Sequence, residues 1–316
     1  MAAGAIRCVC LTGPTACGKT DLALDLARHV PLEVVSMDSA LVYRGMDIGT
    51  AKPSPAVRAA VPHHLVDVVE PYEPYSAGRF ARDARRAIEE IAGRGRLPLL
   101  VGGTLLYLRA LRDGLAALPR ADAALRASIE AEAAERGWEA MHRKLAAVDP
   151  DAALRISPGD RQRIQRALEV HALTARPITA LQRETAPAGA AGIEYLVIAL
   201  VPDDRAALAA RIERRFDTMV AQGFIKEVEK LRARGDLRPD MASMRAVGYR
   251  QIWSYLAGEI DWAEARRRAV AATRQLAKRQ LTWLRSERDC ERWEPLEPGI
   301  AARLRSRVDA FRAPAP

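Results

Sequence analysis

A glycine-rich loop between an apolar run and a helical pattern is the feature that most constrains the fold of this chain. Residues 13–20 read Gly-Pro-Thr-Ala-Cys-Gly-Lys-Thr and match the spacing G-x-x-x-x-G-K-[ST] in full. The run Ile6–Leu11 predicts a buried strand before the loop, and leucine spacing predicts a helix from about Lys19 to His29 after it. Such a loop turns backbone N–H groups toward phosphate oxygens, and the helix N-terminus adds partial positive charge. We therefore expect a site for a di- or triphosphate.

The N-terminal third continues to alternate apolar runs with helical patterns. Leu32–Met37, Leu65–Val69 and Leu97–Val101 predict further strands, and Ser76–Gly93 predicts an amphipathic helix. A last buried strand is expected at Tyr195–Val201. Strands that alternate with helices form a parallel sheet with helices on both faces. The sequence therefore predicts an α/β, P-loop NTPase-like fold.

A purely helical pattern interrupts this alternation between residues 122 and 183. The clearest helices there are expected at Asp122–Arg136, Trp138–Val148 and Asp160–Thr174, and residues 186–192 read as a linker. We expect residues 1–115 and 194–316 to form the catalytic core, and 116–193 to form an all-helical insertion domain. The C-terminal part of the core is predicted to be helical, at Asp203–Arg234, Ala246–Ala257, Asp261–Arg285 and Ile300–Phe311.

The composition excludes several classes of protein. A chain of 316 residues with 49% hydrophobic and 28% charged residues can bury a large core and is too apolar for disorder. No apolar run approaches the ~20 residues of a membrane span and no secretory signal precedes the loop, so we expect a cytoplasmic protein with no membrane partner. The four cysteines form no CxxC pair, which argues against a disulfide framework and a structural zinc site. The net charge of +9 favours polyanionic partners such as nucleic acid.

The chemistry of the loop predicts roles for its residues and for one acid. Lys19 can reach a terminal phosphate, and the Thr20 hydroxyl can hold Mg²⁺. Asp38 follows the predicted strand Leu32–Met37, and a carboxylate at that end of a central strand faces the ligand crevice. Asp38 is therefore expected to be a general base or a metal-shell ligand beside the phosphates. The residues expected to bind the diphosphate are Gly13, Pro14, Thr15, Ala16, Cys17, Gly18, Lys19 and Thr20.

Several longer blocks carry a family resemblance. The chain reads DSALVYRGMDIGTAKP at 38–53, HHLVD at 63–67, VGGTLLY at 101–107, DRQRIQRALE at 160–169, GF at 223–224, RAVGYR at 245–250 and KRQLTWLR at 278–285. With the loop, these blocks resemble the tRNA dimethylallyltransferases, also called tRNA isopentenyltransferases, over roughly residues 6–285. The departures are small, such as Cys17 where Ser is common and Ala40-Leu41 where Met-Gln is also seen. The zinc finger of eukaryotic members is missing, so the chain resembles the shorter bacterial form.

The resemblance implies a prenyl transfer to RNA. The dimethylallyl group of dimethylallyl diphosphate would move to the exocyclic N6 of the adenine beside the tRNA anticodon, and diphosphate would leave. The loop would then hold a leaving group, although family members are often described as ATP-binding because of it. The implied cofactor is Mg²⁺, the implied partners are tRNA and dimethylallyl diphosphate, and we expect a monomer.

Three residues are expected to carry the chemistry: Asp38, Thr104 and Lys19. The adenine amine is a poor nucleophile because its lone pair is delocalised into the ring, so Asp38 as general base could contribute ~10²–10⁴-fold. The loop amides, Lys19 and Mg²⁺ are expected to stabilise the charge on the departing diphosphate, which should be the larger effect. Thr104 closes a strand at the same sheet edge, where its hydroxyl could reach either the base or the leaving oxygen.

Basic residues on the predicted helix Asp261–Arg285 indicate an RNA-facing surface. Between residues 262 and 285 there are seven basic residues and one acid, and four of the basic residues recur at spacings of 7, 4 and 7: Arg267, Arg274, Lys278 and Arg285. An adenine inside a folded anticodon arm must be turned out to react, and Tyr107, Tyr249 and Trp253 are candidates to stack on it, although each is more often a core residue. In the insertion, helical spacing puts Ile164 toward the core and Gln162, Arg163 and Arg166 outward.

By resemblance, the 162–166 stretch and Arg126 meet the anticodon arm. The full set of expected tRNA-binding residues is Asp38, Ser39, Ala40, Leu41, Thr104, Arg126, Gln162, Arg163, Ile164, Gln165, Arg166, Arg245, Ala246, Val247, Gly248, Tyr249, Arg250, Arg274, Lys278, Arg279 and Arg285.

Three other functions stay open on the sequence. A prenyltransferase acting on free adenine nucleotides would share the loop and the base, but it would need neither the helical insertion nor the basic helix. A P-loop kinase or ATPase would release phosphate from ATP without an isoprenoid. A non-catalytic RNA-binding module would have no need of Gly18, Lys19 and Thr20.

Overall fold

The computed structural model describes residues 5–184, 192–287 and 289–313. The chain divides into two compact units, one made of residues 1–112 and 190–316 and the other of residues 113–189. The first unit contains the sheet, and the described residues of the second unit form helices and loops. Residues 186–191 of the predicted linker lie outside the described residues.

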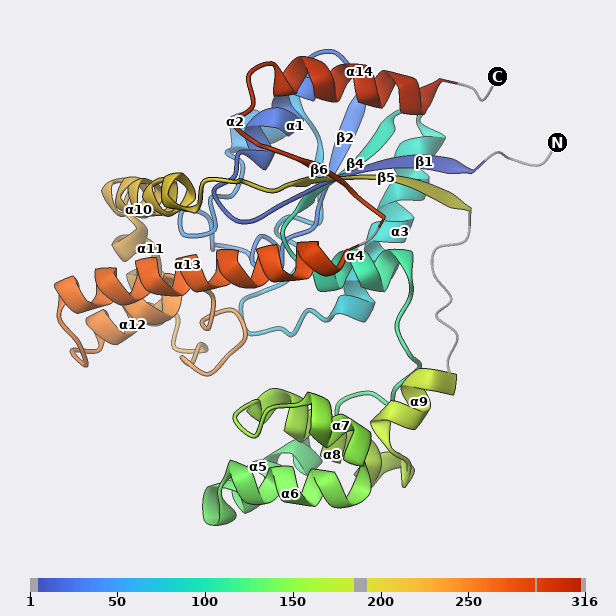
Figure 1. Cartoon of the computed structure of the whole chain (residues 1–316). Coiled ribbons are helices and arrows are strands. Elements are labelled where there is room, and N and C mark those ends of the chain that lie inside the picture. Colours follow the sequence, from blue (N-terminus) through green and yellow to red (C-terminus); the bar gives the residue numbers. More distant parts are fainter. Residues whose placement is uncertain (1–4, 185–191, 288, 314–316) are drawn as a thin grey trace. The chain divides into compact units, whose positions relative to one another are not determined.

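The sheet of the first unit is fully parallel over its six strands. Its order is β3-β2-β4-β1-β5-β6, and every pair of neighbours runs in the same direction (Figure 1). The strands are β1 (Ile6–Thr12), β2 (Leu32–Ser36), β3 (His63–His64), β4 (Leu97–Gly102), β5 (Ile193–Leu200) and β6 (Glu291–Trp293). The carboxyl ends of β1, β2 and β4 therefore meet at one edge of the sheet.

Alternation along the strands sends apolar side chains into two cores. Cys8 and Cys10 of β1 pack with α3 (Ala77–Gly93) and α4 (Leu105–Arg112) on one face of the sheet. Val9 and Leu11 of the same strand pack on the other face, with α1 (Lys19–Ala27) and α14 (Ile300–Arg312). Because both faces are covered, the strands are apolar runs rather than alternating ones. The predicted α/β fold with helices on both faces is confirmed.

The remaining helices of this unit form a C-terminal helical part beside the sheet edge. This part consists of α10 (Arg205–Ala221), α11 (Phe224–Ala233), α12 (Tyr249–Leu256) and α13 (Trp262–Ser286). The short helix α2 (Pro55–Ala60) also belongs to this unit but lies earlier in the chain. The apolar stripe of α13 is buried at Val270, Ala277, Leu281 and Leu284, as the helical spacing predicts. The long α13 crosses the unit from α12 to α4 (Figure 1).

The second unit is built from five helices in its described residues. They are α5 (Ala123–Arg136), α6 (Trp138–Val148), α7 (Pro150–Arg155), α8 (Arg161–Thr174) and α9 (Ile178–Glu184). Aspartates cap the N-termini of α5 and α8, where the Asp122 and Asp160 carboxylates accept hydrogen bonds from the Leu125 and Arg163 amides.

Three sequence-based boundaries are wrong. The strand expected at Leu65–Val69 is instead His63–His64, because Leu65 and Asp67 adopt left-handed backbone angles that turn the chain out of the sheet. The single helix expected over 203–234 is two helices, broken at Gly223 with φ 103°. The helix expected from Ala246 begins only at Tyr249.

The structure also bears on the predicted absence of membrane spans and of disulfides. In the described residues, no helix is long and apolar enough to cross a membrane. The four cysteines, at positions 8, 10, 17 and 290, all carry free thiols.

Close backbone packing at the strand ends gives a test of the fold. A Cβ on Gly102, the last residue of β4, would lie 2.0 Å from the Met37 carbonyl oxygen. Gly102→Ala should therefore destabilise the protein by about 1–3 kcal/mol, because backbone atoms must shift. Gly93→Ala is the matched control, since nothing lies within 4 Å of its Cβ position at the end of α3. Denaturant unfolding measures both variants, and equal midpoints would contradict the packing described here.

Candidate active site

The phosphate-binding loop lies between β1 and α1, as its sequence predicts. Three of its residues have positive φ angles: Gly13 with 156°, Ala16 with 64° and Gly18 with 97°. Gly18 is the N-cap of α1, and because glycine has no side chain, no side-chain hydrogen bond caps the first amides of the helix. Free amides at a helix N-terminus attract anions. Lys19 bridges the loop, because its ammonium donates hydrogen bonds to the carbonyl oxygens of Gly13 at 2.9 Å and Pro14 at 2.6 Å.

Gln280 of α13 braces this loop against the end of β4. Its Oε1 accepts a hydrogen bond from the Thr15 amide at 2.9 Å, and its Nε2 donates to the Gly103 carbonyl at 3.0 Å. A Cβ on Gly103 would lie 2.2 Å from that Nε2, so a side chain there would displace the brace. Gln280 is not among the residues predicted from the sequence to have a role, although it lies inside the block at 278–285.

Asp38 lies at the sheet edge, as its position after β2 predicts. Its Oδ1 accepts a hydrogen bond from the Ala40 amide at 2.8 Å, which orders the turn that follows the strand. Thr104 lies beside the same turn, because its hydroxyl accepts a hydrogen bond from the Ser39 amide at 3.2 Å. The structure therefore brings Asp38 and Thr104 to neighbouring turns.

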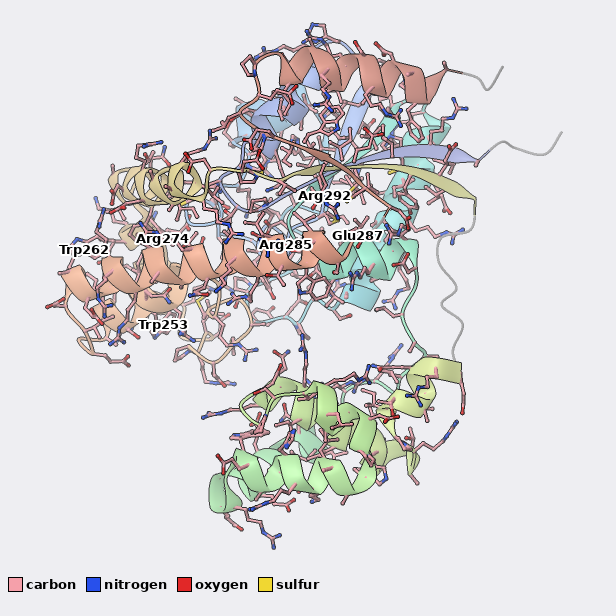
Figure 2. All side chains as sticks on the ribbon, in the orientation of Figure 1. Trp253, Trp262, Arg274, Arg285, Glu287 and Arg292 are labelled. Carbon is pink, nitrogen blue, oxygen red and sulfur yellow. The ribbon has the colours of Figure 1, made fainter. Side chains whose placement is uncertain are left out.

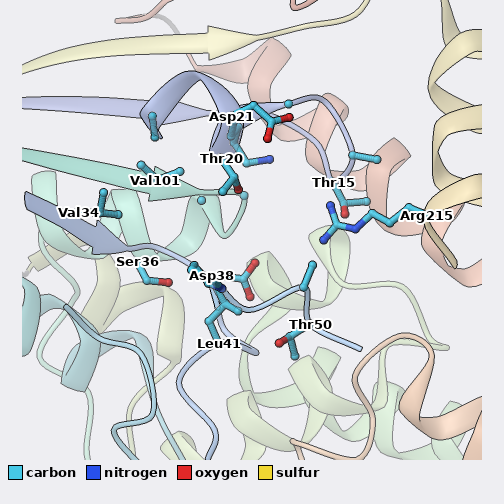
Figure 3. Close-up of a pocket in the computed structure, with 18 of the residues that line it drawn as sticks. Thr15, Thr20, Asp21, Val34, Ser36, Asp38, Leu41, Thr50, Val101 and Arg215 are labelled. Carbon is cyan, nitrogen blue, oxygen red and sulfur yellow. The ribbon is translucent and has the colours of Figure 1, made fainter. Parts of the chain in front are cut away.

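A cavity of about 590 Å³ joins the loop to Asp38. Lys19, Thr20, Asp38 and Leu41 all line it. Figure 3 shows Asp38 in this cavity, with Thr20 and Asp21 at the start of α1 and the guanidinium of Arg215 reaching in from α10. The glycine-rich loop and the expected base thus line the same cavity.

Three arginines of α10 also line this cavity, and the sequence analysis missed them. They are Arg211, Arg214 and Arg215. Arg211 donates a hydrogen bond to the Ala16 carbonyl of the loop at 2.9 Å. Burial lowers the pKa of Arg215 from its ordinary value, and the nearby Asp38 carboxylate opposes that shift. The basic run Arg-Ile-Glu-Arg-Arg at 211–215 is visible in the sequence, but only the folded structure shows that its arginine side chains line this cavity.

A smaller cavity of about 130 Å³ adjoins the first. Asp38, Thr50 and Arg215 line both cavities. Its wall is mostly apolar and also includes Ala40, Gly49, Ile212, Phe216, Met219, Phe224, Ala246, Val247, Gly248, Tyr249 and Leu276. The expected tRNA-binding residues 246–249 therefore form part of a pocket wall rather than an open surface.

The three candidate stacking aromatics are core residues. Tyr107, Tyr249 and Trp253 are 4%, 0% and 8% exposed. The phenol of Tyr249 donates a hydrogen bond to Glu227 at 2.6 Å. These rings pack inside the unit and offer no open face to a base. The flanking Arg245 and Arg250 are exposed.

The basic face of α13 is exposed at Arg274, Lys278, Arg279 and Arg285. Arg274 pairs with Glu213 of α10 at 3.2 Å. Figure 2 shows Arg274 and Arg285 on the same long helix, and these two line a groove between α10 and α13 together with Arg205 and Lys278. This groove has a floor of apolar residues that includes Leu208 and Leu281.

The expected RNA-binding residues of the helical unit differ in exposure. Gln162 and Arg163 are exposed, whereas Ile164 is fully buried in the core of the unit, so its side chain cannot meet a partner. Gln165 donates hydrogen bonds to the Arg126 carbonyl and the Glu130 carboxylate.

Arg126 and Arg166 are tied to a buried acid, Glu169, which has an exposure of 0%. Arg126 donates to both carboxylate oxygens, at 2.9 and 3.1 Å, and Arg166 donates at 2.6 Å. Burial alone would raise the pKa of Glu169, but these hydrogen bonds outweigh it and hold the pKa below the ordinary value. Both arginines therefore stabilise the unit, whatever else they contact.

The oxygen donors at the loop fit magnesium. No group of three or more His, Cys, Asp or Glu suited to a metal occurs in residues 5–184, 192–287 and 289–313. Mg²⁺ needs no such cage, since it binds through one or two protein oxygens and completes its shell with phosphate oxygens and water. The Thr20 hydroxyl and the Asp38 carboxylate line one cavity and provide donors of that kind. His63 and His64 are engaged elsewhere, with the Val61 carbonyl and Glu33.

Comparison with known proteins gives consistent matches. The tRNA dimethylallyltransferase of Cupriavidus taiwanensis is 60% identical over 282 residues, which cover 88% of each chain. That of Thioalkalivibrio sulfidiphilus is 58% identical over 306 residues, covering 96% of this chain and 95% of the relative. The crystal structure of the tRNA isopentenylpyrophosphate transferase of Bacillus halodurans has a TM-score of 0.70 and 37% identity, with 97% of this chain and 96% of that one covered.

A more distant structure shares the fold. A eukaryotic dimethylallyltransferase acting on tRNA has a TM-score of 0.77 at 24% identity, covering 98% of this chain and 80% of that one. The family model described as IPP transferase matches residues 41–287. The chain belongs to the IPP transferase family.

Proposed function

We infer that the protein transfers the dimethylallyl group of dimethylallyl diphosphate to N6 of the adenine adjacent to the tRNA anticodon, with release of diphosphate. The roles proposed for the residues rest on one observation: the glycine-rich loop and Asp38 line the same cavity. A bond forms between N6 and the first carbon of the prenyl chain, and the bond from that carbon to the diphosphate oxygen breaks.

The diphosphate is held by fixed positive charge on two sides. The loop amides and Lys19 lie on one side, and Arg211, Arg214 and Arg215 of α10 lie on the other. Charge develops on the departing oxygens, and donors that are already in place stabilise it without reorganisation. We propose Mg²⁺ as the cofactor, held by the Thr20 hydroxyl with Asp38 nearby. When bound, it would neutralise phosphate charge.

Asp38 accepts the proton that leaves N6. The Ala40 amide holds its Oδ1, so the carboxylate keeps one orientation in the cavity. Thr104 supports this turn through Ser39, and its hydroxyl is proposed to contact the base or the leaving oxygen. Arg215 lies close enough to interact with the Asp38 charge.

The smaller cavity suits the hydrocarbon part of the donor. Its wall includes Phe216, Met219, Phe224 and Leu276, and it opens beside Asp38 and the loop residue Thr15. An apolar chain gains free energy when it leaves water for such a wall. We place the dimethylallyl group there, with its diphosphate in the larger cavity.

Exposed cations are proposed to bind the tRNA backbone. Arg245 and Arg250 lie beside the smaller cavity wall, and the basic face of α13 carries Lys278, Arg279 and Arg285. In the helical unit, Gln162 and Arg163 are proposed to meet the anticodon arm. Such contacts position an RNA without reading its sequence. We propose that the protein acts as a monomer in the cytoplasm.

The direct test uses bulk tRNA and dimethylallyl diphosphate labelled in its carbon chain. Label should enter the RNA, and nuclease digestion should release it as N6-(dimethylallyl)adenosine. Asp38→Ala should lower turnover by at least ~100-fold because the base is lost, while its affinity for tRNA stays close to that of the wild type. Turnover that is unchanged in this variant would remove Asp38 from the mechanism, and label that stays in small molecules would overturn the transfer to RNA.

The basic face of α13 gives a separate prediction on RNA binding. Reversing both Arg274 and Lys278 to Glu should weaken tRNA binding and reduce the slope of log affinity against log salt by about 1 to 2, since each phosphate contact contributes roughly 0.7–0.9. Arg28→Glu, an exposed charge reversal at the end of α1, is the control. Filter binding over a series of salt concentrations measures both. An unaltered slope in the double variant would exclude phosphate contacts by this face.

A further inference from the structure

One carboxylate joins two segments that lie far apart in the sequence. Glu227 is on α11, and its Oε2 accepts hydrogen bonds from the amides of Asp47 at 3.0 Å and Ile48 at 2.7 Å. Its Oε1 accepts from the amide of Gly49 at 3.1 Å and from the phenol of Tyr249 at 2.6 Å. Four donors from two segments therefore meet on one side chain.

Both segments form part of the wall of the smaller cavity, and they touch each other, since a Cβ on Gly49 would lie 2.7 Å from the Tyr249 ring. Gly49 and Thr50 come from the loop after β2, and residues 246–249 come from the turn into α12. The same atom, Glu227 Oε1, binds the Gly49 amide of one segment and the Tyr249 phenol of the other. Burial and the charge of Glu227 raise the pKa of Tyr249, so the phenol stays protonated and able to donate. Glu227 thus links the two segments directly.

The ring of Phe224 sets how closely the segments can approach. A Cβ on Gly49 would lie 2.0 Å from this ring, and a Cβ on Gly248 would lie 2.9 Å from it. Both glycines are thus in direct backbone contact with one aromatic side chain. Phe224 limits the approach of the segments from inside, while Glu227, one helical turn later, holds them together.

We propose that Glu227 is a specificity-determining residue, which fixes the width of the smaller cavity so that it accepts a five-carbon prenyl chain and excludes a longer one. The proposal rests on the proposed function, in which this cavity of about 130 Å³ holds the hydrocarbon part of the donor. An apolar pocket rejects a longer chain only while its walls cannot move apart, because otherwise the extra methylenes gain free energy by burial.

Glu227→Gln tests this with little change in volume. The glutamine side chain keeps one oxygen acceptor, but its NH₂ group cannot accept a hydrogen bond from a backbone amide. At least one of the hydrogen bonds that link the segments is therefore lost. Tyr249→Phe removes the phenol donor alone and leaves the three backbone hydrogen bonds in place. Glu229→Gln is the matched control, because it removes the same charge from an exposed position two residues along α11.

The measurement is kcat/KM with tRNA for dimethylallyl diphosphate and for the ten-carbon geranyl diphosphate. The wild type and Glu229→Gln should both prefer the five-carbon donor strongly. In Glu227→Gln the ratio of the two kcat/KM values should fall at least about tenfold, the scale on which apolar pockets discriminate chain length. Tyr249→Phe should show a smaller fall in the same direction. A merely structural role would lower both activities together and leave their ratio unchanged.

An unchanged ratio in both Glu227→Gln and Tyr249→Phe would overturn the proposal, and so would a wild type that uses both donors equally well. If Glu227→Gln fails to fold by circular dichroism, the ratio in Tyr249→Phe decides alone. Failure of the proposed function is distinguishable, because the wild type would then transfer neither prenyl group to RNA.

Discussion

Parallel pairing brings the carboxyl ends of β1, β2 and β4 to one sheet edge, and the candidate site depends on this pairing. Thr12, just before the phosphate loop, pairs in register with Gly102, and Ser36 pairs with Val101. The residues that follow each strand are therefore neighbours although they are far apart in sequence. The glycine-rich loop after β1 is the proposed anion site, the turn after β2 carries Asp38, and the turn after β4 carries Gly103 and Thr104.

The helices after β5 complete this edge with side chains. Gln280 bonds both the loop and Gly103, so α13 fixes the spacing between two strand ends. Arg211 bonds the loop directly, and Arg215 reaches the cavity near Asp38. A phosphate enclosed by cations on two sides needs little rearrangement when its charge rises during bond cleavage. The C-terminal helical part is thus a component of the candidate site, and its exposed cations are the ones proposed to bind RNA.

The phosphate loop and Asp38 were predictable because local sequence and strand polarity determine their positions. The loop motif carries its own geometry, and an acid after a buried central strand faces the crevice in any parallel sheet. The arginines of α10 were not predictable, since their direction depends on how a helix more than 170 residues later packs against the loop. Glu227 was missed for the same reason, because its partners at 47–49 become neighbours only in the folded chain. The short strand at His63–His64 was missed because its two residues are not apolar, whereas the apolar run that predicted a strand begins at Leu65, where the backbone turns out of the sheet.

In the proposed reaction, the glycine-rich loop binds the diphosphate that leaves. Calorimetric titration of inorganic pyrophosphate into the wild type and Lys19→Ala tests it without any transfer reaction, with Lys226→Ala as a control for the loss of one lysine charge outside the loop. We expect Lys19→Ala to bind at least about tenfold more weakly, as loss of a charge-assisted contact to phosphate implies, and Lys226→Ala to match the wild type. Equal affinity in all three proteins would contradict the claim.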